Sequence, residues 1–201
     1  MSIVTLLLIL VIPGGIAIYE YMKNGSTGGS SSMSTQQNAS NSQFLTDGYP
    51  DISPQDQGGN FDTTYDQNML DASQKHNVPF ALIKAHAIRE SSLRSNAFHN
   101  DYSDHSSYGL MQVEWWPGSG RLAKFGYPDS EIGDGSMLYD PETNCDIGAG
   151  IIKANLDWLG NLRDAINAYN TGVPESEREA PDNYVNDVLG YYSTLVGSTV
   201  T

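Results

Sequence analysis

An apolar run from residue 78 to residue 90 leaves few choices for the fold of this chain. It reads Val-Pro-Phe-Ala-Leu-Ile-Lys-Ala-His-Ala-Ile-Arg-Glu. Pro79 suits the first turn of a helix, and the apolar residues that follow it recur three or four positions apart. Other apolar runs after residue 66 also favour helical spacing over alternation, and the sequence shows no internal repeat. These patterns predict a mainly α-helical domain.

Glu90 ends this run on the side of its apolar residues. Ile83, Ala87 and Glu90 lie three or four positions apart, so Glu90 continues the stripe that would face the core. A carboxyl group that is partly shielded from water has a raised pKa, and a glutamate that keeps its proton can act as a general acid on a glycosidic oxygen. Spacing alone favours a simpler alternative, a surface glutamate at a frayed helix end.

Short motifs follow Glu90-Ser91 along the chain. They are Gly-Leu-Met-Gln at 109–112, the segment 138–150, Ala-Tyr-Asn-Thr-Gly at 168–172 and Tyr-Val at 184–185. In this order they resemble the lytic transglycosylase domain of the lysozyme superfamily, over about Asp66 to Tyr192. The resemblance implies a lysozyme-like α-helical fold and an enzyme that cuts the glycan strands of peptidoglycan, with Glu90 as the catalytic acid.

The resemblance also implies a set of substrate-binding residues. Tyr169 would approach the glutamate and the substrate, Met111 and Gln112 would line the cleft, Asn170 would bind a sugar amide, and Ser91 would complete the set. A sugar cleft needs polar groups for hydroxyl and acetamido groups, together with flat aromatic faces for pyranose rings.

Trp115 and Trp116 follow the Gly-Leu-Met-Gln turn and could provide such an aromatic face. Tryptophans in a domain of this size are more often core residues, so the sequence favours the core for both. Stacking on a sugar is the alternative for either ring.

The sequence departs from the transglycosylases directly after Gln112. Where they usually continue with proline and threonine, this chain reads Val-Glu-Trp-Trp at 113–116, which is closer to goose-type lysozymes and some phage lysins. Those proteins carry an acidic residue at the place of Glu114 and another in the preceding loop, which here holds Asp101 and Asp104.

A second carboxylate would change the chemistry of such a site. An inverting hydrolase uses one on the far side of the sugar to activate water, whereas a transglycosylase lets the C6 hydroxyl of the substrate attack. For Glu114, Asp101 and Asp104 the favoured alternative is solvated charge in a protein that is acidic throughout. The sequence therefore leaves hydrolysis or transglycosylation open.

The first residues form a separate apolar segment. From Ile3 to Tyr19 the chain has no charged residue, a span just long enough for a membrane helix. A secretory signal would carry a basic residue before this run, and none is present, although Gly-Ile-Ala at 15–17 resembles a cleavage site after Pro13. We therefore predict a hydrophobic N-terminal helix at 1–22 that is retained as a transmembrane anchor, with a signal segment or a buried core helix as the alternatives.

A polar stretch rich in glycine and serine follows the apolar segment, and it contains little apolar material. Such a composition predicts a flexible linker at 23–65, ahead of a lysozyme-like domain at 66–201. A linker of this kind would give a membrane-fixed domain the reach to search a mesh some distance away.

The net charge of −14 argues against a nucleic-acid partner, because phosphate binding needs a basic surface. The expected partners are peptidoglycan glycan strands and, through the N-terminal segment, a membrane. Cys145 is the only cysteine, so no intrachain disulfide forms.

The sequence predicts no metal and no cofactor. His99 and His105 flank Asp101 and Asp104, but their spacing matches no zinc signature. The acidic run at 129–140 lacks the glycine and terminal glutamate of a calcium loop.

Three functions follow as hypotheses. The first is a membrane-tethered peptidoglycan lytic enzyme in which Glu90 is acid and then base, the second a lysozyme-like hydrolase with a second carboxylate, and the third a glycan-binding module without activity. The setting is a bacterial envelope or a phage virion that opens the wall during genome entry. The small size and the absence of a basic residue before the apolar run favour the phage.

Overall fold

The computed structural model describes residues 8–12, 15–19, 49–100, 105–177 and 183–200. The chain divides into two compact units, Met1–Ser40 and Asn41–Thr201.

The first unit contains two antiparallel strands, β1 (Leu8–Ile12) and β2 (Gly15–Tyr19), in which Leu8 lies opposite Tyr19. The structure thus differs from the predicted N-terminal helix in the described part of 1–22. β-Branched isoleucine and valine favour strands, and a proline inside the run removes a helical hydrogen bond. Within the described residues, no helix has the length and apolar character to cross a membrane.

The second unit is built mainly from helices, as the sequence predicts. The helices are α1 (Asp66–His76), α2 (Phe80–Ser91), α3 (Asp129–Ile132), α4 (Pro141–Leu159), α5 (Leu162–Thr171) and α6 (Tyr184–Val196). Short 3-10 turns are η1 (Pro54–Asp56), η2 (Ala123–Phe125), η3 (Ser136–Tyr139) and η4 (Glu175–Glu177). One small antiparallel sheet has the order β3 (Phe98–Asn100), β4 (Ser106–Tyr108) and β5 (Val113–Trp115).

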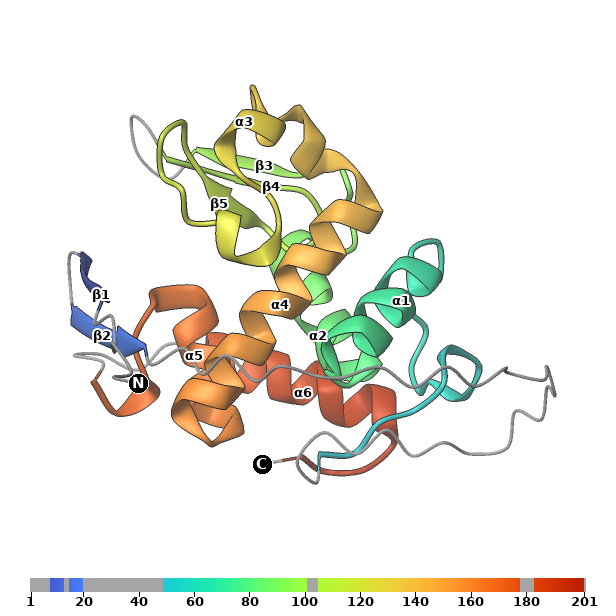
Figure 1. Ribbon diagram of the computed structural model, residues 1–201. Coiled ribbons are helices and arrows are strands. Elements are labelled where there is room, and N and C mark those ends of the chain that lie inside the picture. Colours follow the sequence, from blue (N-terminus) through green and yellow to red (C-terminus); the bar gives the residue numbers. More distant parts are fainter. Residues whose placement is uncertain (1–7, 13–14, 20–48, 101–104, 178–182, 201) are drawn as a thin grey trace, which may run out of the picture. The chain divides into compact units, whose positions relative to one another are not determined.

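The long helix α4 organises this unit (Figure 1). It packs against α1 and α5, while α2 packs against α6. The sheet and α3 lie together beside the first part of α4, and α5 and α6 lie toward its other end (Figure 1). This arrangement brings together the last turn of α2, the first turn of α6 and the loop that leads into β5.

Local sequence explains where α4 begins and where it ends. Pro141 occupies its first turn, and the carboxylate of Asp140 caps it by accepting a hydrogen bond of 2.9 Å from the backbone N–H of Thr143. The helix ends at Leu159 and is followed by Gly160, which has a φ of +68°. Burial of apolar surface stabilises the core, whose fully buried members include Phe80, Leu82, Ile83, Met111, Leu138, Ile147 and Tyr192.

The folded domain begins before the predicted boundary at residue 66. The carboxylate of Asp51 caps α2, accepting hydrogen bonds of 3.1 Å from the backbone N–H groups of both Phe80 and Ala81. Tyr192 on α6 donates to the carbonyl oxygen of Pro50. The predicted linker is therefore wrong for residues 49–65, because a polar segment can join a fold through capping hydrogen bonds that its composition does not reveal. Residues 23–48 lie outside the described residues.

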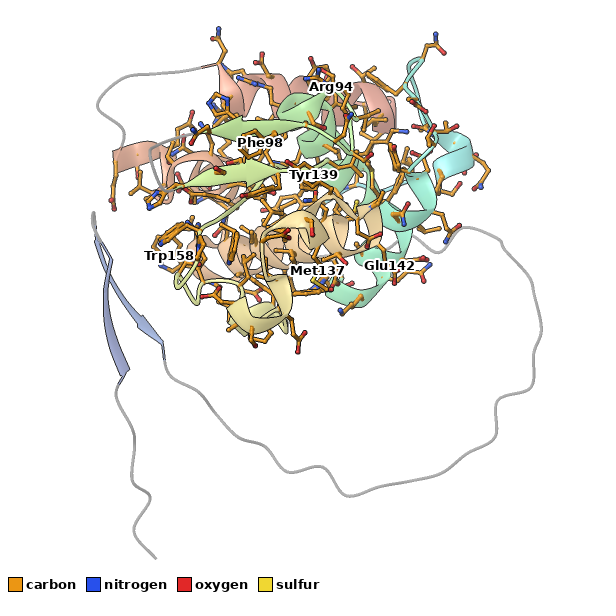
Figure 2. The ribbon with its side chains drawn as sticks, turned by 90° about the horizontal axis from the view of Figure 1, so that it is seen from above. Arg94, Phe98, Met137, Tyr139, Glu142 and Trp158 are labelled. Carbon is orange, nitrogen blue, oxygen red and sulfur yellow. The ribbon has the colours of Figure 1, made fainter. Side chains whose placement is uncertain are left out.

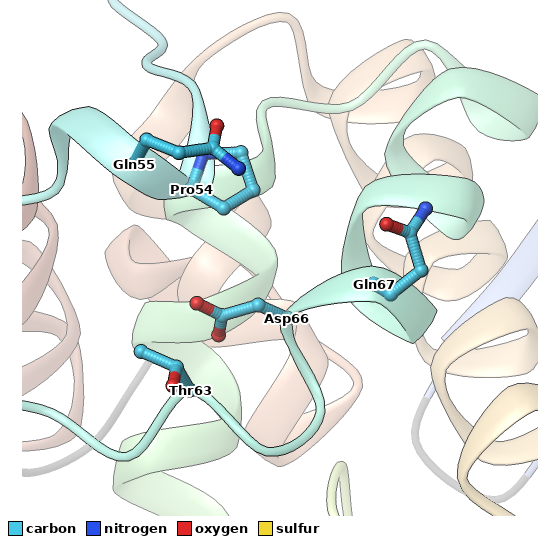
Figure 3. Close-up of a pocket in the computed structure, with 5 residues that line it drawn as sticks. All are labelled: Pro54, Gln55, Thr63, Asp66 and Gln67. Carbon is cyan, nitrogen blue, oxygen red and sulfur yellow. The ribbon is translucent and has the colours of Figure 1, made fainter.

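A buried lysine ties this early segment to α2. Lys84 is fully buried, and its Nζ donates to Oδ1 of Asp66 and to Oε1 of Gln57, both at 2.6 Å. Asp66 also lines a pocket between η1 and the start of α1 (Figure 3). The carboxylate of Asp66 is already paired with the buried Lys84, so its negative charge is neutralised within the protein. None of the predicted site residues lines this pocket.

Candidate active site

Glu90 is the last residue but one of α2, and it is half-buried. Ile83 and Ala87 on the same stripe are fully buried, so the predicted stripe is present and Glu90 lies where it meets the surface. The hydroxyl of Tyr184, the first residue of α6, donates a hydrogen bond to Oε1 of Glu90. A carboxyl group is therefore held at a helix end by a donor from another helix.

Two tyrosines surround this carboxyl group. Burial and the negative charge of Glu90 raise the pKa of Tyr169 well above its usual range. The same two causes raise the pKa of Tyr184 well above its usual range. Both phenols therefore stay protonated and neutral near neutral pH, and both remain hydrogen-bond donors.

His86 lies one helical turn before Glu90 and is fully buried. Its Nδ1 is 3.1 Å from the hydroxyl oxygen of Tyr184, and its ring centroid is 4.6 Å from that of Tyr169. Burial lowers the pKa of His86 to about 3, so the imidazole is neutral above that pH.

Arg89 lies over the ring of Tyr184. Its guanidinium carbon lies 5.2 Å from the centroid of the Tyr184 ring, and its Nε is 3.0 Å from Oδ2 of Asp187 on α6. This surface ion pair is about 40% exposed at both side chains. Its contribution to stability is therefore small.

The Gly109–Gln112 motif forms a tight turn that is clamped by α4. Gly109 has a φ of +74°, and a Cβ atom there would lie 2.5 Å from Nδ2 of Asn144. The same Nδ2 donates to the carbonyl oxygens of Tyr108 and Leu138, and Oδ1 of Asn144 accepts from the backbone N–H of Met111 at 2.7 Å. Only glycine fits this position, for both steric and conformational reasons.

Met111 and Gln112, which are predicted to line the cleft, both make contacts that hold the turn together. Met111 is fully buried, and its carbonyl oxygen accepts a hydrogen bond of 2.8 Å from the hydroxyl of Tyr169. Gln112 has a φ of +46° and is half-buried. Its amide nitrogen donates to the carbonyl oxygens of Gly109 and Ala97. Both residues therefore support the turn and fix the position of Tyr169.

Ser91 and Asn170 differ in how far their side chains are exposed to solvent. Ser91 is only 2% exposed; its hydroxyl donates to the carbonyl oxygen of Ala87 and accepts from the backbone N–H of Arg94. It thus shapes the end of α2 next to Glu90. Asn170, near the end of α5, is exposed to solvent and can meet a ligand.

Glu114 lies in the middle of β5, on the opposite face from the buried Val113 and Trp115. Its carboxylate forms an ion pair with Arg121, and one of its oxygens is 3.7 Å from Nδ1 of His105. The carboxylate is therefore already engaged by positive or polar groups. The other two carboxylates proposed from sequence, Asp101 and Asp104, lie outside the described residues.

The two tryptophans after the turn have separate roles. Trp115 is 2% exposed and donates from Nε1 to Asp129 at 2.9 Å, which makes it a core residue. Trp116 stacks on His105 with centroids 3.8 Å apart, and the guanidinium of Arg121 lies 5.2 Å from its ring. Trp116 thus already uses its ring for contacts within the protein.

Phe98 on β3 is an exposed aromatic ring that the sequence did not single out (Figure 2). It is 54% exposed and packs edge-on against Tyr108, which in turn packs against Tyr139. No sequence motif marks it, because its exposure follows from its place on a short strand.

Three residues of this site were not assigned a role from sequence. His86 could have been found from its position four residues before Glu90, and Tyr184 belongs to a motif that gave it no contact. Asn144 belongs to the motif at 138–150, which gave it no contact either. Among the described residues, no three His, Cys, Asp or Glu side chains gather closely enough to hold a metal ion. The expectation that the protein needs no metal stays a prediction.

Comparison with known proteins bears on this arrangement. The family model for the transglycosylase SLT domain matches residues 67–186, more than half of the chain. The chain is also similar to protein IpgF of Shigella flexneri and of Shigella sonnei. It is 25% identical to each over 128 residues, which cover 64% of this chain and 80% of each relative.

Solved structures support the same fold. Lytic transglycosylase Slt from Pseudomonas aeruginosa, solved as an inactive mutant, matches 66% of this chain with a TM-score of 0.53 and 21% identity. The 70 kDa soluble lytic transglycosylase from Escherichia coli matches 69% with a TM-score of 0.52 and 24% identity. This chain spans about a quarter of each of those proteins, 24% and 25%. The predicted lytic transglycosylase enzyme is confirmed, and the chain belongs to the transglycosylase SLT domain family.

Proposed function

We propose that this protein cleaves the β-1,4 bond between N-acetylmuramic acid and N-acetylglucosamine in peptidoglycan, with Glu90 as the group that moves the proton. Lytic transglycosylase activity on peptidoglycan is supported at the level of the family. The observation that carries the assignment to Glu90 is its half-buried carboxyl group at the end of α2, with the Tyr184 hydroxyl bonded to it.

The proposed reaction uses one carboxyl group twice. Protonated Glu90 gives its proton to the glycosidic oxygen as the bond from that oxygen to C1 of the muramic acid breaks. The carboxylate then takes the proton of the C6 hydroxyl as that oxygen attacks C1 and closes a 1,6-anhydro ring. No water is consumed, and Glu90 ends with its proton restored.

Tyr184 suits the charge change in this reaction. Its hydroxyl donates to Glu90, and a charge-assisted hydrogen bond is stronger to a carboxylate than to a neutral carboxyl group. It therefore stabilises Glu90 between the two proton transfers. Tyr169, which is bonded to the backbone of Met111, is a second neutral phenol influenced by the same charge.

The surroundings of Glu114 favour transglycosylation over hydrolysis in this proposal. A base that activates water needs a free carboxylate across the sugar, and Glu114 is paired with Arg121 and near His105. A muramidase of the goose-type lysozyme kind is the second candidate, since Asp101 and Asp104 lie in the loop where those enzymes carry an acidic residue.

Mass spectrometry of the muropeptides released from purified peptidoglycan by the full chain tests both candidates. We expect products with 1,6-anhydro ends, one water lighter than reducing ends. Glu90→Gln should lower the rate of release by a factor of at least about 10³. Glu114→Gln, the matched control, should keep most of it. Reducing ends, together with a loss of activity in Glu114→Gln, would instead establish hydrolysis.

Undiminished cleavage by Glu90→Gln would overturn the assignment of Glu90. Binding of glycan strands by the unchanged protein without any release would favour the third hypothesis, a glycan-binding module. The Glu90→Gln variant therefore tests which residue transfers the proton, and the product ends test which reaction takes place.

We also propose that residues 1–22 attach the enzyme to a membrane, in a phage virion or a bacterial envelope. The apolar, uncharged sequence from Ile3 to Tyr19 supports this attachment. Flotation of the full chain with phospholipid vesicles should exceed that of a fragment that begins at residue 23. Equal flotation would remove the attachment from the proposal.

A further inference from the structure

His86 is a fully buried imidazole one helical turn before Glu90, and the proposed reaction does not use it directly. It comes from α2, and its ring lies between tyrosines from α5 and α6, with centroids 4.6 Å from Tyr169 and 6.0 Å from Tyr184. Its Nδ1 is hydrogen-bonded to the hydroxyl of Tyr184 at 3.1 Å. The atoms therefore form a chain that runs from the imidazole to the phenol and on to the carboxyl group.

The number of hydrogens decides the direction of this chain. A phenol has one hydrogen, and that of Tyr184 is directed at Glu90. The hydrogen between Tyr184 and His86 must then belong to the imidazole, so Nδ1–H donates to the phenol oxygen. Nε2 of His86 has no hydrogen-bond partner among the described residues. A proton on Nε2 would leave a buried N–H unsatisfied, so the fold selects the Nδ1–H form.

We propose that His86 is a positioning residue for the cleavage reaction, whose Nδ1–H occupies the phenol oxygen of Tyr184 and so directs the phenol hydrogen onto Glu90. This inference rests on the proposed role of Glu90 as the proton-transfer group. It assigns to His86 a fixed neutral form, with the proton of the reaction held on Glu90 alone.

The other ionisable groups around this chain are protonated or paired. Tyr169 from α5 and Tyr184 from α6 are neutral phenols, and Cys145 on α4, which influences Tyr169, has its pKa raised by burial to about 12. Arg89 lies over the Tyr184 ring and is paired with Asp187. Of these described groups, Glu90 is therefore the one that the proposed reaction protonates and deprotonates.

Removing the imidazole should weaken the hydrogen bond that reaches Glu90 from Tyr184. In His86→Leu the phenol can rotate, so the carboxylate loses an aligned donor and holds its proton to higher pH. We expect kcat to fall about tenfold with KM nearly unchanged, and the alkaline limb of the pH–rate profile to move up by about half a pH unit to one unit. His86→Asn places an amide N–H near the position of Nδ1 and should restore both values toward those of the unchanged protein.

The test needs a readout that a packing defect would not move. In a Tyr184→Phe background, His86→Leu should leave the alkaline limb where the single Tyr184→Phe variant has it, because the imidazole acts through that hydroxyl. A further shift in the double variant would overturn the proposal. The proposal would also be overturned if His86→Leu folds and the alkaline limb of its pH–rate profile does not move.

Nitrogen-15 NMR of the imidazoles in the full chain tests the same idea without a substitution. We expect the His86 resonances to show a protonated Nδ1 and a bare Nε2, unchanged between about pH 5 and pH 8. A proton on Nε2, or an imidazolium in that range, would overturn the inference. Activity in Glu90→Gln would instead overturn the proposed role of Glu90 and leave the assigned form of His86 intact.

Discussion

Burial of one histidine makes the stability of this domain depend on pH. The pKa of His86 falls to about 3 through burial, whereas an unfolded chain would bind a proton below the ordinary value of about 6.5. Between these two values the unfolded state holds more protons than the folded state. Folding stability is therefore lost as the pH falls from about 6.5 toward 3, by up to about 1.4 kcal/mol per pH unit.

Urea denaturation at about pH 7 and pH 5 measures this linkage. The unchanged protein should lose about 2 kcal/mol of unfolding free energy between these conditions. His86→Leu should lose clearly less, because it has no imidazole to protonate on unfolding. An identical loss in His86→Leu would show that other groups cause the dependence.

At the scale of elements, α4 packs against the turn at 109–112, and this turn positions Tyr169. Gly148 on α4 meets the side chain of Met111, and a Cβ atom there would lie 2.8 Å from the Met111 Cβ and Cγ atoms. The carbonyl oxygen of Met111 in turn accepts from Tyr169. The close approach of one helix to one turn therefore decides the position of a residue on a second helix.

Two glycine substitutions in helices should have opposite effects. Gly148→Ala should destabilise the domain by about 1–3 kcal/mol, because the added methyl group forces Met111 to move. Gly190→Ala on α6 meets nothing within 4 Å and should stabilise it by about 0.5–1 kcal/mol through helix propensity. Thermal denaturation of both variants measures the pair. A neutral Gly148→Ala would mean that the turn yields at little cost, and its muropeptide release should then be normal.

At the scale of the whole molecule, the segment before α1 is part of the folded domain. Gln57 bonds to the buried Lys84, Asp51 caps α2, and the backbone N–H of Gly58 donates to the carbonyl oxygen of Leu195 at 2.7 Å. A fragment that lacks this segment would leave the first N–H groups of α2 without their cap and Lys84 with one partner fewer.

Fragments of two lengths test this boundary. Residues 49–201 should melt cooperatively and release muropeptides, while residues 66–201 should be less stable by several kcal/mol or fail to fold. In a fragment of residues 49–201 with Asp51→Ala, the loss of the cap alone should cost about 1 kcal/mol. Equal melting of the two fragments would show that residues 49–65 only cover the domain.

The sequence by itself determined the helical class, the family and the place of Glu90 at the end of an apolar helix. It could do so because helical periodicity and short motifs are local properties of the chain. Tertiary structure decided the rest of the site. Tyr184 reaches Glu90 across 94 positions, His86 is dry because α5 and α6 cover it, and Met111 and Ser91 are buried supports. Such contacts depend on how helices pack, and no local pattern in the sequence encodes that packing.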